Sequence, residues 1–439
     1  MADIRTEIHE HFGEPCEFFP VVRHEVQTYE RPNLQLALDE FVSEAKKSSL
    51  VGVIERDYDA TLTRLVSQNA VTDFSKGPVE FLDCELGPDE RLTCVKRGLY
   101  LVESADGDRS VILVGAAKDD YPPRILLEVM ARSQKDAETV LRHLTRAVRL
   151  GKAYRGRVFS LGRDYHGAVH VKFHTLPEIT RESIILPAVL LERIERHTIS
   201  FSRHAARLRE CGRHLKRGLL LHGSPGTGKT LTAMYLVSRM VDRTVIILTG
   251  EGMGSIEAAC HLARMLEPAT VILEDVDLIG TQRGYQTLNA NALLFELLNQ
   301  MDGLGEDCDV LFVLTTNRPD ELEPALASRP GRIDQAFEVP LPDSDCRKRL
   351  LELYGKGLHV EMGDAESIVE RLDGASAAFI RELLRKASLL AADDDDQVIN
   401  VRQRHLEEAL TELLVAGGRL TQTLLGAREG RVARGSNGE

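Results

Sequence analysis

One eight-residue segment, 223–230, constrains this 439-residue chain more than any other. It reads GSPGTGKT and matches G-x-x-x-x-G-K-[ST], with an apolar strand candidate (219–221) before it and a helix candidate (231–240) after it. Glycines let backbone N–H groups close around phosphate oxygens, while Lys229 supplies a charge and Thr230 a hydroxyl for Mg²⁺. The helix that follows directs its positive end at the same anion. A glycine-rich turn that matches by chance would not explain the order strand, loop, helix, so we predict a phosphate-binding loop.

The chain around and after this loop alternates short apolar strands with helices of about 10–15 residues, which predicts a parallel sheet sandwiched by helices. Strands are expected at 218–222, 244–249, 270–273 and 310–315, and helices at 231–240, 256–266 and 291–301. Beyond Pro342 the pattern is almost purely helical, with helices expected at 345–354, 365–372, 379–392 and 404–415. The fold class is therefore α/β, with a helical lid at the C-terminal end of the sheet domain.

The first part of the chain predicts a separate α+β domain that carries no recognisable catalytic motif. Strands are expected at 111–114, 125–129, 157–161 and 169–173, and a helix at 135–148. Pro177 and Pro187 flank a linker-like stretch. The predicted domains are 1–180 (α+β), 181–200 (linker), 201–342 (nucleotide-binding α/β), 343–415 (helical lid) and 416–439 (mostly disordered tail).

Composition narrows the classes of function. Lys and Arg total 55 against 68 Asp and Glu, a formal net charge of −13, so a domain-wide basic surface for nucleic acid is absent. The seven cysteines never form C-x-x-C, which favours reduced thiols without a disulfide frame or a zinc site. No apolar run reaches the roughly 18–20 residues of a membrane span, and the N-terminus lacks the apolar core of a secretory signal. These features favour the cytoplasm.

A second chemical signal lies about 45 residues after the loop, where the apolar run 271–273 ends in Glu274 and Asp275. Carboxylates at the end of a parallel strand can bind Mg²⁺ and orient an attacking water, as phosphoryl transfer requires. Two acids that cap the next helix are the simpler alternative, and the preceding phosphate loop makes it the weaker one.

Residues 197–415 resemble an ATPase of the classical AAA family, of the cell-division-cycle and valosin-like type. The resemblance is carried, in the family's order and spacing, by GSPGTGKT (223–230), VILEDVD (271–277), LLNQMDGL (297–304), TTNRPDELEPALASRPGRID (315–334) and LDGASAAFIRELLRKA (372–387). It implies ATP and Mg²⁺ as cofactors and an oligomeric ring, usually a hexamer, with nucleotide held between neighbouring subunits.

The resemblance also assigns roles to individual residues. Asn317 matches the polar sensor that holds the water against the γ-phosphate, although an Asn before Pro319 is also typical of a plain turn. Arg329 and Arg332 bracket an exposed Pro-Gly turn and match the arginine fingers offered to the neighbouring subunit, with surface salt bridging as the alternative. The expected nucleotide-binding residues are Ser224, Pro225, Gly226, Thr227, Gly228, Lys229, Thr230, Leu231, Gly374 and Ala375, and the expected Mg²⁺ ligands are Thr230 and Glu274.

The sequence departs from the family at two places. The family places Asp before Glu, whereas here Glu274 takes the metal position and Asp275 the base position; the same inversion occurs in the mitochondrial Rieske-protein translocase branch. A shift near 1 Å can cost about a hundredfold in rate. The loop 250–254 (GEGMG) is shorter than a pore loop and lacks its aromatic, leaving Met253 either to grip a polypeptide or to pack against the core.

We therefore predict an ATP-hydrolysing ring enzyme that remodels a protein substrate or works through an adaptor, with residues 1–180 selecting the partner or assisting assembly. The alternative is an ATP-controlled assembly scaffold or switch with slow hydrolysis, which the inverted acids and the reduced pore loop favour. A nucleic-acid motor or loader is less favoured because the chain is acidic.

Overall fold

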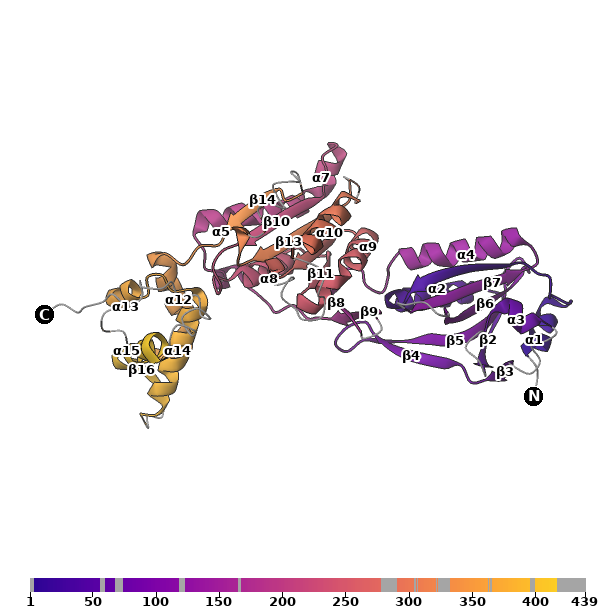
Figure 1. Ribbon diagram of the computed structural model, residues 1–439, viewed down its shortest axis with the longest axis horizontal. Helices are drawn as coiled ribbons and strands as arrows, with labels where there is room; N and C mark the ends of the chain where they lie inside the picture. Colours follow the sequence, from indigo (N-terminus) through magenta and orange to yellow (C-terminus); the bar gives the residue numbers. More distant parts are fainter. Residues whose placement is uncertain are drawn as a thin grey trace. The chain divides into compact units, whose positions relative to one another are not determined.

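The structure is a computed structural model that describes residues 4–55, 60–67, 74–117, 123–164, 167–277, 290–303, 305, 307–320, 322, 332–361, 363, 365–394 and 399–416 (Figure 1). The chain divides into two compact units. Unit 1 comprises Met1–Thr175 and Thr244–Glu267, and unit 2 comprises Leu176–Arg243 and Pro268–Glu439. Among the helices described, none combines the length and the apolar character that a bilayer crossing requires.

Unit 1 contains an antiparallel sheet of seven strands in the order β1-β7-β6-β5-β2-β3, with β4 also paired to β5. The strands are β1 (Val21–Gln27), β2 (Lys47–Glu55), β3 (Phe74–Gly77), β4 (Glu80–Glu85), β5 (Arg91–Glu103), β6 (Arg109–Ala116) and β7 (Arg124–Ala131). Both β6 and β7 are buried along almost their whole length, because helices cover both faces of the sheet.

Alternate residues of the central strands supply the two cores. Val111 and Leu113 pack with α1 (Ile4–Phe12) and α3 (Leu62–Val66) on one face. The intervening Ile112 and the residues on its side pack with α2 (Arg31–Ser43) and α4 (Gln134–Arg149) on the other face. Figure 1 shows α4 running along the sheet, where it contacts β7 and β1. Because strand side chains alternate between faces, each central strand serves both cores.

Unit 1 also holds a second, smaller group of strands. In it β11 (Thr244–Leu248) pairs in parallel with β8 (Val158–Arg163), which pairs antiparallel with β9 (Val169–Phe173). Helix α9 (Ile256–Met265) follows β11 after the 3₁₀ segment Gly250–Ser255. Tyr154, Phe159 and Phe173 pack with ring centroids 5.4–5.8 Å apart and hold the β8–β9 hairpin together.

Met253 lies in the 3₁₀ segment that follows β11 and is only 2 % exposed. The structure thus favours the packing alternative over a polypeptide grip for this side chain. The physical reason is that the segment contacts β8, so the thioether is covered by the chain's own core.

Unit 2 contains parallel strands in the order β14-β10-β13-β12. They are β10 (Arg217–His222), β12 (Ala269–Leu273), β13 (Val310–Thr316) and β14 (Gln335–Glu338), with α8 (Lys229–Arg239) and α10 (Ala290–Asp302) between strands in the sequence. Strands β12 and β13 are buried at every position. This confirms the α/β fold class, because buried parallel strands need helices on both faces.

The segment predicted as a linker, 181–200, is folded. It forms a 3₁₀ turn (Arg181–Ser183), α5 (Ala188–Glu195) and a π-helical turn (Arg196–Ser200), which continue into α6 (Phe201–Arg203) and α7 (Ala205–Glu210). Leu191 and Ile194 are buried at helical spacing. An open linker would leave these apolar side chains in water, which explains why the segment packs.

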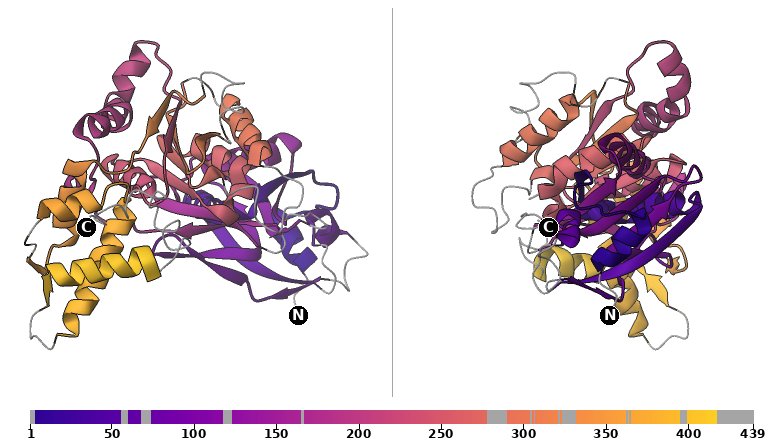
Figure 2. Two further views of the ribbon diagram at one scale, coloured as in Figure 1. Left: turned by 60° about the vertical axis from the view of Figure 1, so that its left-hand side comes forward. Right: turned by 90° about the vertical axis from the view of Figure 1, so that its right-hand side faces the viewer.

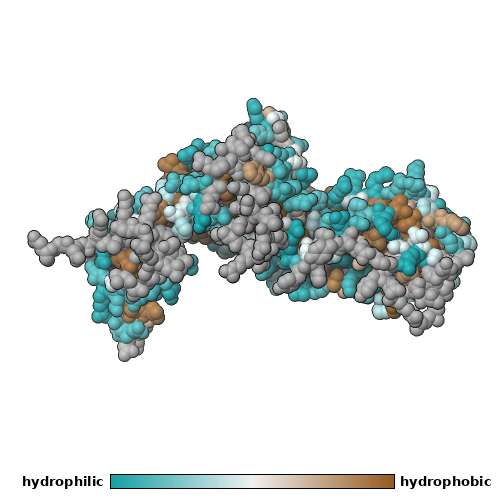
Figure 3. Space-filling model, in the orientation of Figure 1, coloured by the Kyte–Doolittle hydropathy of each residue, from teal (hydrophilic) through white to brown (hydrophobic). Residues whose placement is uncertain are grey.

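The C-terminal part of unit 2 is a helical bundle, drawn in orange to yellow in Figure 2. It comprises α12 (Ser344–Tyr354), α13 (Ala365–Arg371), α14 (Ala377–Ala392), α15 (Gln403–Thr411) and a π-helical turn (Glu412–Ala416), with the short parallel strands β15 (His359–Glu361) and β16 (Asn400–Arg402). Its core centres on Phe379, Ile380 and Leu383, all fully buried. On the face of the molecule shown in Figure 3, hydrophobic residues lie in small groups among hydrophilic ones.

Candidate nucleotide site

The predicted phosphate loop joins β10 to α8, and its glycines adopt conformations that other residues rarely reach. Gly226 has φ +75° and Gly228 φ +97°. A Cβ added to Gly226 would lie 2.8 Å from the Ser376 hydroxyl oxygen, so both the backbone and the surrounding space require glycine here. The backbone N–H groups of such a loop are available to an anion.

Lys229 begins α8 and is largely buried beneath the loop. Its Nζ donates to the carbonyl oxygens of Gly223 and Ser224, each at 2.9 Å. Burial lowers the pKa of the Lys229 ammonium, and the carboxylates of Asp275 and Asp277 oppose this shift. The loop lysine and the acids after β12 therefore share one electrostatic environment.

The remaining residues of the phosphate loop and the start of α8 differ in their exposure to solvent. Thr227 is buried and its hydroxyl donates to the Ser224 carbonyl at 2.9 Å. Pro225, Thr230 and Leu231 are exposed, and Thr230 lies in the first turn of α8, where its hydroxyl is accessible.

Glu274 and Asp275 follow directly after β12. The Glu274 Oε1 atom is buried and, among the residues that the structure describes, has no hydrogen-bond partner. Burial, and secondly the charge of Asp275, raise the pKa of the Glu274 carboxyl. A buried carboxylate oxygen without a partner is costly, and a bound cation would remove that cost. Glu274 and the accessible Thr230 hydroxyl thus fit the oxygen donors that Mg²⁺ prefers.

Asp275 is held in an unusual backbone conformation with φ +49°. Its N–H donates to the Thr315 hydroxyl at 3.0 Å, and its Oδ1 accepts from Asn317 Nδ2 at 3.1 Å. Both partners belong to the end of β13, next to β12 in the sheet. The structure therefore places the predicted base and the predicted sensor in direct contact.

Asp277 is a third acid at this edge, which the sequence analysis did not single out. It is 4 % exposed, and its Oδ1 accepts from the Thr316 hydroxyl at 2.8 Å and from the Asn317 backbone N–H at 3.0 Å. These bonds fix the backbone of the sensor residue. The third acid of the segment 274–277 was a signal in the sequence, but only the pairing of β12 with β13 gives Asp277 a role.

The helical bundle meets the phosphate loop through the start of α14. Ala378 N–H donates to the Gly226 carbonyl at 3.0 Å, and Ser376, the N-cap of α14, lies against Gly226. Gly374 (φ +80°) and the buried Ala375 immediately precede this contact. The predicted lid residues thus lie next to the predicted phosphate loop, although they follow it by about 150 residues in the sequence.

Arg332 forms an ion pair, which is the alternative that the sequence left open beside a role as an arginine finger. Its guanidinium donates through Nε to Asp302 Oδ1 at 2.5 Å and through Nη2 to Asp302 Oδ2. The reason is the charge-assisted pairing of a planar guanidinium with both oxygens of one carboxylate at the end of α10. Arg329 lies outside the described residues. Among the described residues, no group of three or more His, Cys, Asp or Glu side chains forms a metal cluster.

Comparison with known proteins agrees with this geometry. Residues 219–341 match the ATPase family associated with various cellular activities (AAA). The proteasome-activating nucleotidase of Thermococcus onnurineus (strain NA1) is 31 % identical over 272 residues, which cover 54 % of this chain and 67 % of the relative.

Two further relatives share shorter parts of their length. The ATP-dependent zinc metalloprotease FtsH of Mycoplasmopsis synoviae (strain 53) is 32 % identical over 247 residues, covering 52 % of this chain but 36 % of the relative. The 26S proteasome regulatory subunit S10B homolog B of Arabidopsis thaliana is 34 % identical over 189 residues, covering 40 % of this chain and 47 % of the relative. The chain therefore spans from about a third to two thirds of these relatives.

Proposed function

Because the chain belongs to the AAA family of ATPases and is an ATP-hydrolysing enzyme, we propose that it works as a ring of identical subunits, most simply a hexamer, that remodels a protein partner. The observation that carries the catalytic part is the convergence of Lys229, Asp275 and Asn317 at the carboxyl edge of the sheet in unit 2. Each of the three follows a different strand of the sheet, Lys229 after β10 and its loop, Asp275 after β12 and Asn317 after β13, as an open parallel sheet allows.

The residues of the nucleotide site have different roles in phosphoryl transfer. The loop N–H groups and Lys229 bind the phosphates, and Thr230 and Glu274 would hold Mg²⁺. When bound, Mg²⁺ neutralises charge on the β- and γ-phosphate oxygens. Gly374 and Ala375 would border the nucleotide on the side of the helical bundle.

Asp275 accepts the proton of the attacking water, and Asn317 orients that water against the γ-phosphate. The 3.1 Å bond between them supports this assignment, because it places a carboxylate and an amide at one point. A water bound there would meet one acceptor and one neutral donor. Asp275 is one methylene shorter than the family's Glu, so we expect slow turnover without loss of chemistry.

Arg332 and Arg329 would act on the nucleotide of the neighbouring subunit. For Arg332 this requires exchange of Asp302 for phosphate oxygens as the guanidinium's partner. The Glu-Asp order supports placing the chain near the Rieske-protein translocase branch within a valosin-like module. We further propose that the enzyme acts in the cytoplasm, that residues 1–180 select a substrate or adaptor, and that 201–342 and 343–415 form the nucleotide domain and its lid.

The assembly switch remains the second candidate, and the burial of Met253 favours it. A chain-threading enzyme needs a side chain that grips the substrate, and this one is 2 % exposed in the core of unit 1. In the switch, ATP would stabilise the oligomer and slow hydrolysis would time its disassembly.

ATP turnover per subunit, measured across a thousandfold range of protein concentration, tests the proposal. A steep rise to a plateau is expected because the arginines would complete the site of a neighbour. A partner-remodelling enzyme should then be accelerated by partner protein, whereas a switch should not. Turnover that is independent of concentration would contradict the trans role of Arg329 and Arg332.

A further inference from the structure

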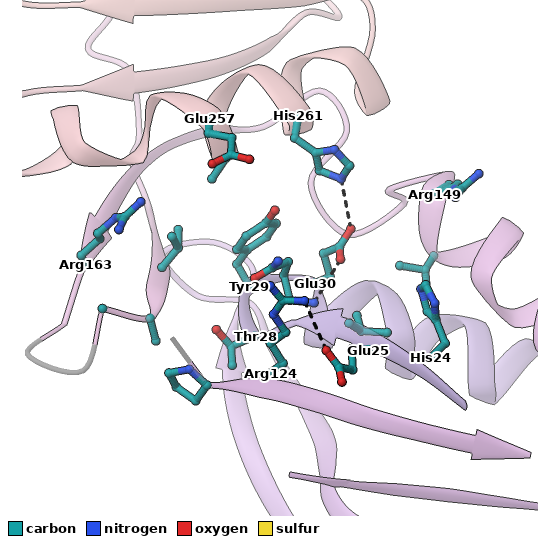
Figure 4. A pocket seen from close by; sticks show the side chains of 18 of the residues that line it. His24, Glu25, Thr28, Tyr29, Glu30, Arg124, Arg149, Arg163, Glu257 and His261 are labelled. Carbon is teal, nitrogen blue, oxygen red and sulfur yellow. Dashed lines mark hydrogen bonds and ion pairs between the residues drawn. The ribbon is translucent and has the colours of Figure 1, made fainter. Parts of the chain in front are cut away.

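Unit 1 contains a groove of about 540 Å³ that none of the phosphate-loop residues lines, and we call it the β1 groove. It is lined by β1 and the turn after it, by the β8–β9 hairpin, and by α4 and α9 (Figure 4). The lining residues on which the argument depends most are residues 24–27 of β1, Glu30, Arg124, Glu257 and His261. Its volume falls within the roughly 300–1,000 Å³ of ligand sites.

The groove runs along the open edges of two sheets. Among the described strands, β1 is last in its sheet and pairs with β7, and β9 is last in the other sheet and pairs with β8. Four consecutive residues, 24–27, line the groove. Side chains of consecutive strand residues point to opposite faces, so a run of four means that the groove follows the backbone edge of β1. Such an edge offers N–H and C=O groups to an added strand.

The groove contains two acidic side chains besides Glu25, and the polar contacts of one of them, Glu30, are long. Glu30 is 8 % exposed, and its Oε1 atom lies 3.7 Å from His261 Nε2 (Figure 4). Its other contact, the Gln27 N–H, is 3.4 Å away, which is long for a hydrogen bond. A second carboxylate, Glu257, lies close enough to act on the Tyr29 phenol, whose pKa is raised first by burial and then by Glu30 and Glu257. Both carboxylates line the groove, so a cation bound in it would be attracted by both.

The other charges of the groove surround these two carboxylates. Arg124 is already paired with Glu25 at 3.2 Å, as the dashed line in Figure 4 shows. Arg149 and Arg163 stand on opposite sides of the view, on α4 and β8. The acidic centre thus lies between basic margins, a pattern that suits a ligand of alternating charge better than a simple anion.

We propose that the β1 groove binds an extended segment of a partner protein, which adds as a strand to the β1 edge and places a Lys or Arg side chain between Glu30 and Glu257. Main-chain bonds to the edge would give affinity, and the acidic pair would give specificity. About four residues of strand, roughly 13 Å long, match the four lining residues of β1. The β1 groove would thus be the place where the partner is selected in the proposed function. The binding itself does not depend on that function, which only explains why the chain would bind such a segment.

The test begins with an array of 12-residue peptides that tile a reduced, carboxymethylated protein, probed with the full chain. The strongest binder is then labelled and titrated by fluorescence anisotropy, without nucleotide. We expect binders to carry Lys or Arg among β-branched residues. Replacing that basic residue with Ala should weaken binding at least tenfold, and methylating alternate backbone nitrogens of the peptide should do the same.

Protein variants provide the matching half of the test. Glu257→Gln, and Glu30→Gln if it folds, should each weaken the same peptide several-fold, whereas Glu44→Gln on the exposed end of α2 should not. Insensitivity of binding to the peptide's basic residue, to backbone methylation, or to both Gln variants would overturn the proposal, as would the absence of any binding peptide. If ATP turnover is normal but no peptide binds, only the proposal for the β1 groove is contradicted. If peptides bind but ATP is not hydrolysed, only the proposed ring enzyme is contradicted.

Discussion

The parallel strands of unit 2 and the antiparallel sheet of unit 1 place their polar groups in different ways. Strands β12 and β13 are buried at every position, so a charged side chain is tolerated only where each strand ends. In unit 1, β1 is exposed over Arg23, His24 and Glu25, and β4 is exposed almost throughout. Polar side chains in unit 1 therefore lie along the exposed strands themselves and not only at the points where strands end.

This difference affects how rigidly each region can hold a ligand. At the sheet edge of unit 2, the ends of β12 and β13 are joined by four hydrogen bonds between residues 275–277 and 315–317. In the β1 groove, the polar contacts found for the Glu30 carboxylate within the described part of the chain are 3.4 and 3.7 Å long. The first arrangement is preorganised for chemistry, and the second leaves partners to be supplied by a ligand.

Removing the lysine of the phosphate loop should have the largest effect on ligand binding, and this effect should be limited to unit 2. Lys229→Ala deletes the ammonium that bonds to Gly223 and Ser224 and would meet the phosphates. We expect ATP binding to fall at least a hundredfold by calorimetry, while peptide binding to the β1 groove is kept. Lys348→Ala, an exposed lysine of α12, is the matched control. Retained ATP affinity would contradict the phosphate role.

Neutralising the predicted base should separate binding from hydrolysis. Asp275→Asn keeps the shape of the side chain but cannot take a proton from water, so turnover should fall by about 10²–10⁴-fold while ATP remains bound. Single-turnover hydrolysis and filter binding on the same sample measure the two quantities. Asp345→Asn, exposed at the start of α12, should change neither. Near-normal hydrolysis in Asp275→Asn would move the base assignment to another residue.

Much of unit 2 was predictable because its signals are local. A strand, a glycine loop and a helix follow one another directly, and the predicted strands at 218–222, 270–273 and 310–315 agree with β10, β12 and β13. The family resemblance gave Asp275 and Asn317 roles at the same attacking water, but their direct contact and the position of Asp277 depend on the pairing of two strands 40 residues apart along the chain.

Unit 1 was less predictable because its important contacts are not local. The strands at 111–114 and 125–129 were recognised from their apolar runs, whereas β1 was missed because its exposed edge carries charged residues. The β1 groove combines residues 24–30 with 257–261, which no short pattern connects. The fold of 181–200 was misjudged because two prolines suggested a linker, while Leu191 and Ile194 pack as a helix requires.

Breaking the core of unit 1 should leave the nucleotide chemistry of unit 2 in place. Glu128 is 1 % exposed; it accepts from Arg23 at 2.7 Å and from the Leu62 N–H at 2.6 Å. Glu128→Ala leaves this buried N–H without a partner and opens a cavity, so we expect a loss of about 3 kcal/mol. Urea unfolding followed by circular dichroism measures the loss, and binding of a fluorescent ATP analogue should persist.

An exposed acid provides the control for Glu128. Glu14 pairs with Arg132 at 2.9 Å on the surface of the same unit, and Glu14→Ala should change the free energy of unfolding by less than about 1 kcal/mol. Loss of ATP binding in Glu128→Ala at temperatures where unit 2 is folded would show that the two regions are not independent.

The smallest expected effect tests how far preorganisation at the sheet edge of unit 2 matters. Asp277→Asn retains an oxygen that can accept from Thr316 and Asn317 but loses the charge that strengthens both bonds. Because Asp277 positions the sensor and does not bind phosphate, kcat should fall about three- to tenfold while KM stays unchanged. Thr316→Val removes one of the two bonds and should act in the same direction, with the double variant less than additive. A rise in KM at constant kcat would instead assign Asp277 to ground-state binding of the nucleotide, and unchanged kinetics would show that the Asn317 backbone is held well enough by β13 alone.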